Sequence, residues 1–104
     1  MGNTCIKLTY LYRDYGNYKL WNELVFWNRF DISFNQIVNT ILSHLMEGQF
    51  FIPEKWKLPT LSFESFDPDL DHAYHEFHEI ELVSEEPTTG EDIAELLLRI
   101  LKYS

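Results

Sequence analysis

A chain of 104 residues, 45% of them hydrophobic, has the size of a single domain over residues 1–104 and is too apolar to be intrinsically disordered. Its formal net charge of −9 argues against direct nucleic-acid binding and favours a basic protein partner. The one cysteine, Cys5, excludes an intramolecular disulfide, and no apolar run is long enough to span a membrane, so a cytoplasmic location is expected.

The first 27 residues carry the pattern of a β-hairpin. Polar and apolar residues alternate over residues 5–14 and again over residues 18–27, which is the period of a strand. Between the two segments, Gly16 and Asn17 can adopt the positive φ angles of a tight turn. The second segment is apolar on both faces, so we expect it to be central in its sheet, or covered on its second face by a loop or a partner.

Residues 33–47 have the features of an amphipathic helix. Ser33 is a suitable N-cap with Gln36 at the capping-box position, and Gly48 is expected at the C′ position. A short strand at 49–52, stopped by Pro53, and an irregular loop over 53–66 should follow. The apolar stripe of the helix consists of Phe34, Ile37, Val38, Ile41, Leu42 and Leu45.

The next segment begins like a helix, with "DPDLD", and then alternates like a strand, with "HEFHEIELV". We predict one helical turn at 68–72, a strand at about 75–83 and a last helix over 90–102 that is capped near Thr89 and Asp92. The elements then follow one another as β-β-α-β-β-α. They predict an α+β fold, in which an antiparallel sheet of about four strands carries two helices on one face.

His72, His75 and His78 stand three residues apart and raise the question of a metal site. On a helix, His72 and His75 could share a metal, whereas on a strand His75 faces away from the other two. The spacing is one residue short of the zinc motif His-Glu-x-x-His, and an EF-hand loop would need glycine where His72 stands. We therefore expect no metal and no cofactor, with a small metal-dependent enzyme using His72, His75 and Glu76 as an alternative.

Glu76 is the acidic residue whose predicted position requires a cationic partner. It shares a predicted strand face with His78, Ile80 and Leu82, so an inward orientation would make it a partly buried acid. Such an acid needs a cationic partner, and Arg13 or Lys19 of the hairpin would supply it. The pair would be either part of a ligand site or a structural bridge.

The hairpin itself combines cationic, amide and flat aromatic side chains. That mixture suits stacking on a base and holding a phosphate, or anchoring a protein partner, although the rings could equally do no more than cover the sheet. The candidate ligand-binding residues of the hairpin are Arg13, Asn17, Tyr18, Lys19 and Trp21, and His72, His75 and Glu76 join them from the later segment.

Residues 67–95 carry eleven acidic residues and no lysine or arginine. A surface of this kind can imitate a phosphate backbone and occupy a basic cleft, or it can be an ordinary solvated face. No nucleophile elbow, phosphate loop or dinucleotide fingerprint is present, so a catalytic site is not indicated.

Three stretches stand out together: "YLYRDYGNYK" at 10–19, "FIPEKW" at 51–56 and "DPDLDHAYHEF" at 67–77. Their pattern resembles a family of small uncharacterised bacterial and phage proteins, over most of the chain. The resemblance implies an accessory or defence-related protein, and it brings no activity or functional residue with it.

These observations favour a non-enzymatic binding protein that sequesters a small polar or nucleotide-like ligand. A protein-directed inhibitor, such as an antitoxin, an immunity protein or an anti-defence protein using its acidic face, is the main alternative. A homo-oligomer is expected, because Trp21, Val25 and Trp27 share a face of their strand that a second copy could bury.

Overall fold

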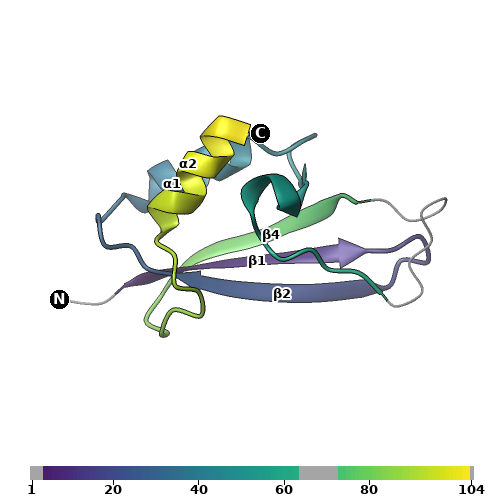
Figure 1. Cartoon of the computed structure of the whole chain (residues 1–104), viewed down its shortest axis with the longest axis horizontal. Helices are drawn as coiled ribbons and strands as arrows, with labels where there is room; N and C mark the ends of the chain where they lie inside the picture. The colour runs from purple at the N-terminus through teal and green to yellow at the C-terminus, as the bar shows by residue number, and fades with distance from the viewer. Residues whose placement is uncertain (1–3, 64–72, 104) are drawn as a thin grey trace.

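A computed structural model describes residues 4–63 and 73–103, which form a four-stranded antiparallel sheet and two α-helices. Across the sheet, the strand order is β2-β1-β4-β3. Helices α1 (Phe34–Ser43) and α2 (Ile93–Tyr103) and the short 3-10 helix η1 (Pro53–Trp56) lie on the same side of the sheet (Figure 1). The predicted α+β architecture is therefore confirmed. The strands are β1 (Cys5–Arg13), β2 (Lys19–Phe26), β3 (Phe50–Phe51) and β4 (His75–Val83).

The hairpin of β1 and β2 forms as predicted, and its two strands are joined by a three-residue loop between Asp14 and Tyr18. Asp14 donates its backbone N–H to the carbonyl of Tyr18 at 3.0 Å and accepts one from Asn17 at 3.0 Å. Asn17 takes the left-handed conformation with φ of 69°, as the last residue of a three-residue hairpin loop does. The left-handed residue of the turn is therefore the asparagine of the predicted Gly16-Asn17 pair.

The expectation of a central position for the second strand is wrong, because β2 is the first strand in the order across the described sheet. The alternative is cover of its second face by a loop or a partner, and Trp21 on that face is 51% exposed. A loop does contact the outer edge of β2 at its C-terminal part. Val25 donates its N–H to the hydroxyl of Thr88 at 2.9 Å and accepts one from the backbone of Thr88 at 2.9 Å. The loop after β4 thus runs along the end of β2.

Strand β4 contains a bulge that changes which of its residues share a face. Thr9 of β1 pairs with Glu79 and Tyr10 with Phe77, so His78 is an extra residue between the two pairs. A bulge of this kind interrupts the simple alternation of a strand. Ile80 therefore points toward the helices, whereas Glu76 points to the other side.

Helix α1 starts where predicted and ends four residues early. The backbone N–H of Gln36 donates to the Ser33 hydroxyl at 3.1 Å, which confirms the cap. The helix ends at Ser43 because Met46 exchanges backbone hydrogen bonds with Phe50, at 2.7 and 2.9 Å. Gly48, with φ of 74°, belongs to this tight turn into β3 and not to a helix C′ position.

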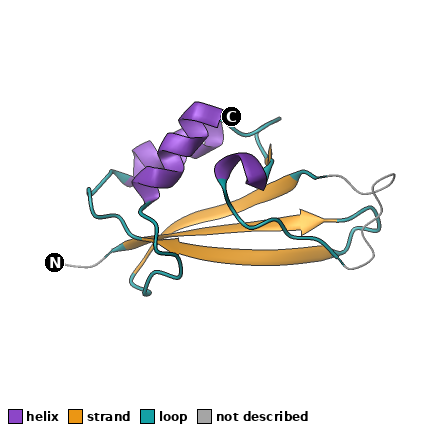
Figure 2. Ribbon diagram, viewed as in Figure 1, coloured by secondary structure: helices purple, strands orange, loops and turns teal. Residues whose placement is uncertain are grey.

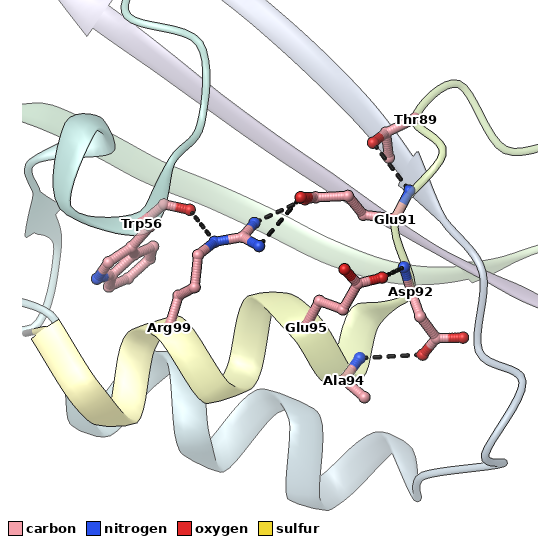
Figure 3. Close-up of polar contacts among 7 residues, drawn as sticks. All are labelled: Trp56, Thr89, Glu91, Asp92, Ala94, Glu95 and Arg99. Carbon is pink, nitrogen blue, oxygen red and sulfur yellow. Dashed lines mark hydrogen bonds and ion pairs between the residues drawn. The ribbon is translucent and has the colours of Figure 1, made fainter.

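The start of α2 is held by a network of polar contacts (Figure 3). Asp92 accepts the N–H of Ala94 at 3.0 Å, and the Glu95 carboxylate accepts the N–H of Asp92 at 3.0 Å, which is a capping box. Arg99 donates to Glu91 at 2.6 and 3.1 Å and to the carbonyl of Trp56 at 2.8 Å. The true cap is therefore Asp92, and Arg99 ties α2 to η1.

The core lies between the sheet and the helices. Burial raises the pKa of the Tyr10 hydroxyl, which donates to the carbonyl of Pro59 at 2.6 Å and accepts from Asn22 at 3.0 Å. These bonds fix the segment after η1 to the sheet. Figure 2 shows how the helices stack above the strands. The fully buried aliphatic residues are Ile6, Leu8, Ile37, Ile41, Ile93, Leu96 and Ile100.

Two expectations from the sequence remain. The helical turn predicted at 68–72 lies outside the described residues. Among the described residues, no helix is long and apolar enough to cross a membrane.

Candidate functional site

The side of the sheet opposite the helices is the candidate functional surface, and we call it the helix-free face. Strand register defines it, because residues directly opposite one another in a sheet point to the same side. Trp21, Leu11, Glu76 and Phe50 are paired in one row across the four strands. The further members are Lys7, Thr9, Arg13, Lys19, Glu23, Val25, Glu79 and Glu81.

Arg13 and Glu76 form the ion pair that the sequence indicated. Arg13 donates from Nε to Glu76 Oε2 at 2.7 Å and from Nη2 to Oε1 at 3.2 Å. Its third contact, from Nη1, is to the side-chain oxygen of Asn17 at 2.6 Å. The hydrogen bond to Glu76 raises the pKa of Arg13 above its usual value. The hairpin turn and the start of β4 are therefore tied together, 63 residues apart in the chain.

Replacing Arg13 with methionine should lower the free energy of unfolding modestly, because it removes two hydrogen bonds to Glu76, but the side chains of the pair are 35% and 18% exposed and water screens them in part. In a double-mutant cycle with Glu76→Gln, the coupling should be favourable and should shrink as salt is added. Urea unfolding at two salt concentrations measures both. Lys19→Met is the matched control, and an equal loss in that variant would contradict the assignment.

His75 lies on the other side of the sheet from Glu76. Its side chain is fully buried, and its Nε2 accepts the backbone N–H of Leu61 at 2.9 Å. An accepting Nε2 leaves the proton on Nδ1, which lies 3.1 Å from the carbonyl of Ala73 and donates to it. Both ring nitrogens are thus engaged, Nε2 with the segment around Leu61 and Nδ1 with the backbone just before β4. His75 and Glu76, both predicted as ligand-binding residues, therefore lie on opposite sides of the sheet, because adjacent strand residues point to opposite faces.

The other predicted site residues spread along the hairpin. Tyr18 and Trp21 are 70% and 51% exposed, and Lys19 is exposed at the first position of β2. His72 lies outside the described residues. Arg13, Asn17 and Glu76 are therefore brought into contact, whereas His75 is separated from them by the sheet.

The structure adds an aromatic contact that the sequence did not reveal. The bulge turns His78 onto the helix-free face, where its ring meets Trp21 edge-on with ring centroids 4.9 Å apart. The two residues come from the two strands on either side of β1. Alternation groups His78 with Glu76, but the contact with Trp21 depends on the strand order, which places β2 and β4 on either side of β1.

A second group missed at the sequence level surrounds Lys7. Its Nζ lies 2.7 Å from Glu85 and 4.0 Å from Glu23. The hydrogen bond to Glu85 raises the pKa of Lys7, and the charges of Glu23 and Glu81 add to this. We call the carboxylates of Glu23, Glu79, Glu81 and Glu85 the acidic cluster. Three of these carboxylates act on the ammonium of Lys7, and the fourth, that of Glu79, lies on the same face opposite Thr9. Together with Lys7 they give this part of the helix-free face a formal net charge of −3.

The described residues, 4–63 and 73–103, contain no group of three or more histidine, cysteine, aspartate or glutamate side chains suited to a metal. The chain matches no protein-family model, and it has no significant match to a curated protein or to a solved structure.

Proposed function

We propose that this chain is a non-enzymatic binding protein that docks a basic protein partner on the helix-free face of its sheet. The acidic cluster is the observation that carries the proposal, since its carboxylates outnumber the one cation among them by three. A positively charged partner surface would complete this arrangement, and complementary charge of this kind speeds association and selects the partner.

An aromatic anchor beside the charges supports a protein partner. Trp21 is half exposed and is braced from the side by His78, so its ring can be covered with little loss of side-chain freedom. Tryptophan is among the residues that contribute most when an interface forms, and its ring also attracts arginine and lysine. Trp21 and Glu23 are next-but-one neighbours on β2, so one partner surface could reach both.

A nucleotide-like ligand is supported less well by the same surface. Arg13, the predicted phosphate donor, is already bonded to Glu76 and Asn17, and a phosphate would have to displace them. His75 points to the helix side, so it adds nothing to a site beside Arg13. Small-molecule sites are usually concave, whereas the residues here lie along a sheet surface.

The proposal extends to the kind of partner. A chain that presents carboxylates to a basic cleft would act as an inhibitor, in the manner of an antitoxin, an immunity protein or an anti-defence protein. The resemblance to small bacterial and phage proteins agrees with that class of role.

Reversing two charges of the acidic cluster, in the variant Glu79→Lys/Glu81→Lys, should weaken binding of the partner at least about tenfold, since like charges then face each other. The partner would be recovered by affinity capture on the wild-type chain and titrated against both forms by calorimetry. Binding to the wild type should also weaken steeply as salt is raised.

The matched control is Glu47→Lys/Glu54→Lys, which makes the same change in net charge at two exposed residues outside the acidic cluster. This variant should bind almost as the wild type does. If both double variants lose the same affinity, net charge alone is responsible and the docking surface is wrong. If neither loses affinity, the partner binds elsewhere.

A further inference from the structure

The outer edge of β2 has backbone groups that no neighbouring strand uses. In an antiparallel pair, alternate residues direct their N–H and C=O groups toward the partner strand. The hydrogen bond from Asp14 N–H to Tyr18 C=O shows that Tyr18 points toward β1. Because the direction alternates from one residue to the next, the N–H and C=O groups that point away from β1 are those of Lys19, Trp21, Glu23 and Val25.

The chain itself already pairs with one end of this edge. The carbonyl of Val25 accepts from Thr88 at 2.9 Å, and Trp27 forms a parallel bridge with Asp92. Within the described part of the chain, the outward groups of Lys19, Trp21 and Glu23 have no such partner. Residues 19–23 therefore form an open strand edge, and open edges are templates for another strand.

We propose that this edge pairs with the same edge of a second copy, which gives a two-fold homodimer with one continuous eight-stranded sheet. In the antiparallel arrangement centred on Trp21, Lys19 lies opposite the partner's Glu23, and Glu23 lies opposite the partner's Lys19. Directly opposed residues have Cβ atoms about 5 Å apart, which is close enough for an ion pair. The short sequence Lys19-Leu20-Trp21-Asn22-Glu23 is thus complementary to itself.

Other alignments of the two edges lose this complementarity. Centring the pair on Lys19 or on Glu23 would oppose two like charges, which destabilises a sheet. A lysine on an edge strand normally discourages pairing with other sheets. Here Glu23 offers the matching charge, so the edge would select its own copy over an arbitrary strand.

The same alignment also explains an exposed tyrosine. Tyr18 is 70% exposed, and the alignment centred on Trp21 places it opposite the partner's Leu24. Leu24 also borders a surface pocket of about 420 Å³, whose lining is both apolar, with Phe26 and Leu58, and polar, with Lys57, Thr88, Thr89 and Glu91. Dimerisation would thus bring Tyr18 against Leu24 at the border of this pocket. The inference shares Glu23 with the acidic cluster, but it rests on the open backbone edge of β2. Dimerisation is measured without a basic partner, so the dimer and the proposed function can fail separately.

Sedimentation velocity on the full chain tests the inference through charge swaps. The wild type should sediment at twice the 12.5 kDa mass of one chain, and each single variant, Lys19→Glu or Glu23→Lys, should dissociate at the same concentration. The double variant K19E/E23K should restore the dimer. An equimolar mixture of the two single variants should also dimerise. Position 19 of one variant then lies opposite position 23 of the other, and the two side chains in each such pair carry opposite charges.

Lys55→Glu and Glu54→Lys, on the exposed surface of η1, are the matched controls and should leave the dimer intact. Far-ultraviolet circular dichroism shows whether each variant is folded. Recovery of the dimer in the double variant would show that the single variants dissociate because of their charges and not because they misfold. A monomeric wild type, a higher oligomer, or single variants that remain dimeric would each overturn the inference.

Discussion

Replacing His75 with alanine should lower the free energy of unfolding by about 3 kcal/mol, the joint cost of a cavity and a lost hydrogen bond. The ring is fully buried and packs against Tyr10 and Tyr12, with centroids 6.0 and 5.0 Å away. It also accepts the N–H of Leu61, which would lose its partner. Urea unfolding followed by far-ultraviolet circular dichroism measures the loss.

Two further variants separate packing from hydrogen bonding. His75→Phe keeps a ring in place and loses the acceptor for Leu61, so it should cost about 2 kcal/mol. His78→Ala is the matched control and should cost less than about 1 kcal/mol, because His78 is exposed and only its contact with Trp21 is lost. A wild-type chain whose stability fell on adding a chelator would contradict the structural assignment of His75.

Replacing Trp56 with alanine should cost about 4 kcal/mol, as large-to-small changes of buried tryptophan do. The Trp56 side chain is 1% exposed and stacks on Phe51, with ring centroids 4.6 Å apart and planes 9° from parallel. Its backbone carbonyl also accepts from Arg99, so the residue joins η1 to both the sheet and α2 (Figure 3). A domain of ordinary stability would lose a large part of its free energy of unfolding.

Trp21→Ala is the comparison for this variant, because Trp21 is 51% exposed on the helix-free face. We expect a loss of less than about 1 kcal/mol there in the monomeric protein. Chemical unfolding should again be followed by circular dichroism, since both changes remove a fluorophore. Equal losses at the two positions would show that the packing of η1 contributes little.

Periodicity predicted most of the fold. The two-residue alternation located β1, β2 and β4 closely, and Ser33 marked the start of α1. The pair of Arg13 and Glu76 was also predictable, because a poorly exposed carboxylate in a chain with few cations needs a partner, and the hairpin carries three of those cations, Lys7, Arg13 and Lys19.

Two features depended on contacts that a pattern does not contain. The bulge at His78 results from the pairing of β4 with β1, and it turned Ile80 and Glu76 to opposite sides. The early end of α1 results from the pairing of Met46 with Phe50. The bulge is decided by pairing with a distant strand, whereas the helix end is decided by a local turn over 46–50 that interrupts the apolar stripe. The acidic cluster around Lys7 was missed because it joins residues from distant parts of the chain.

The acidic cluster is also where the proposed function can be tested most directly. Carbodiimide labelling of carboxylates, read by mass spectrometry with and without the captured partner, reports which acids become covered. We predict protection of Glu79, Glu81 and Glu23 in the complex and unchanged labelling of Glu54 on the helix side. Protection of Glu54, with the acidic cluster still labelled, would contradict docking on the helix-free face.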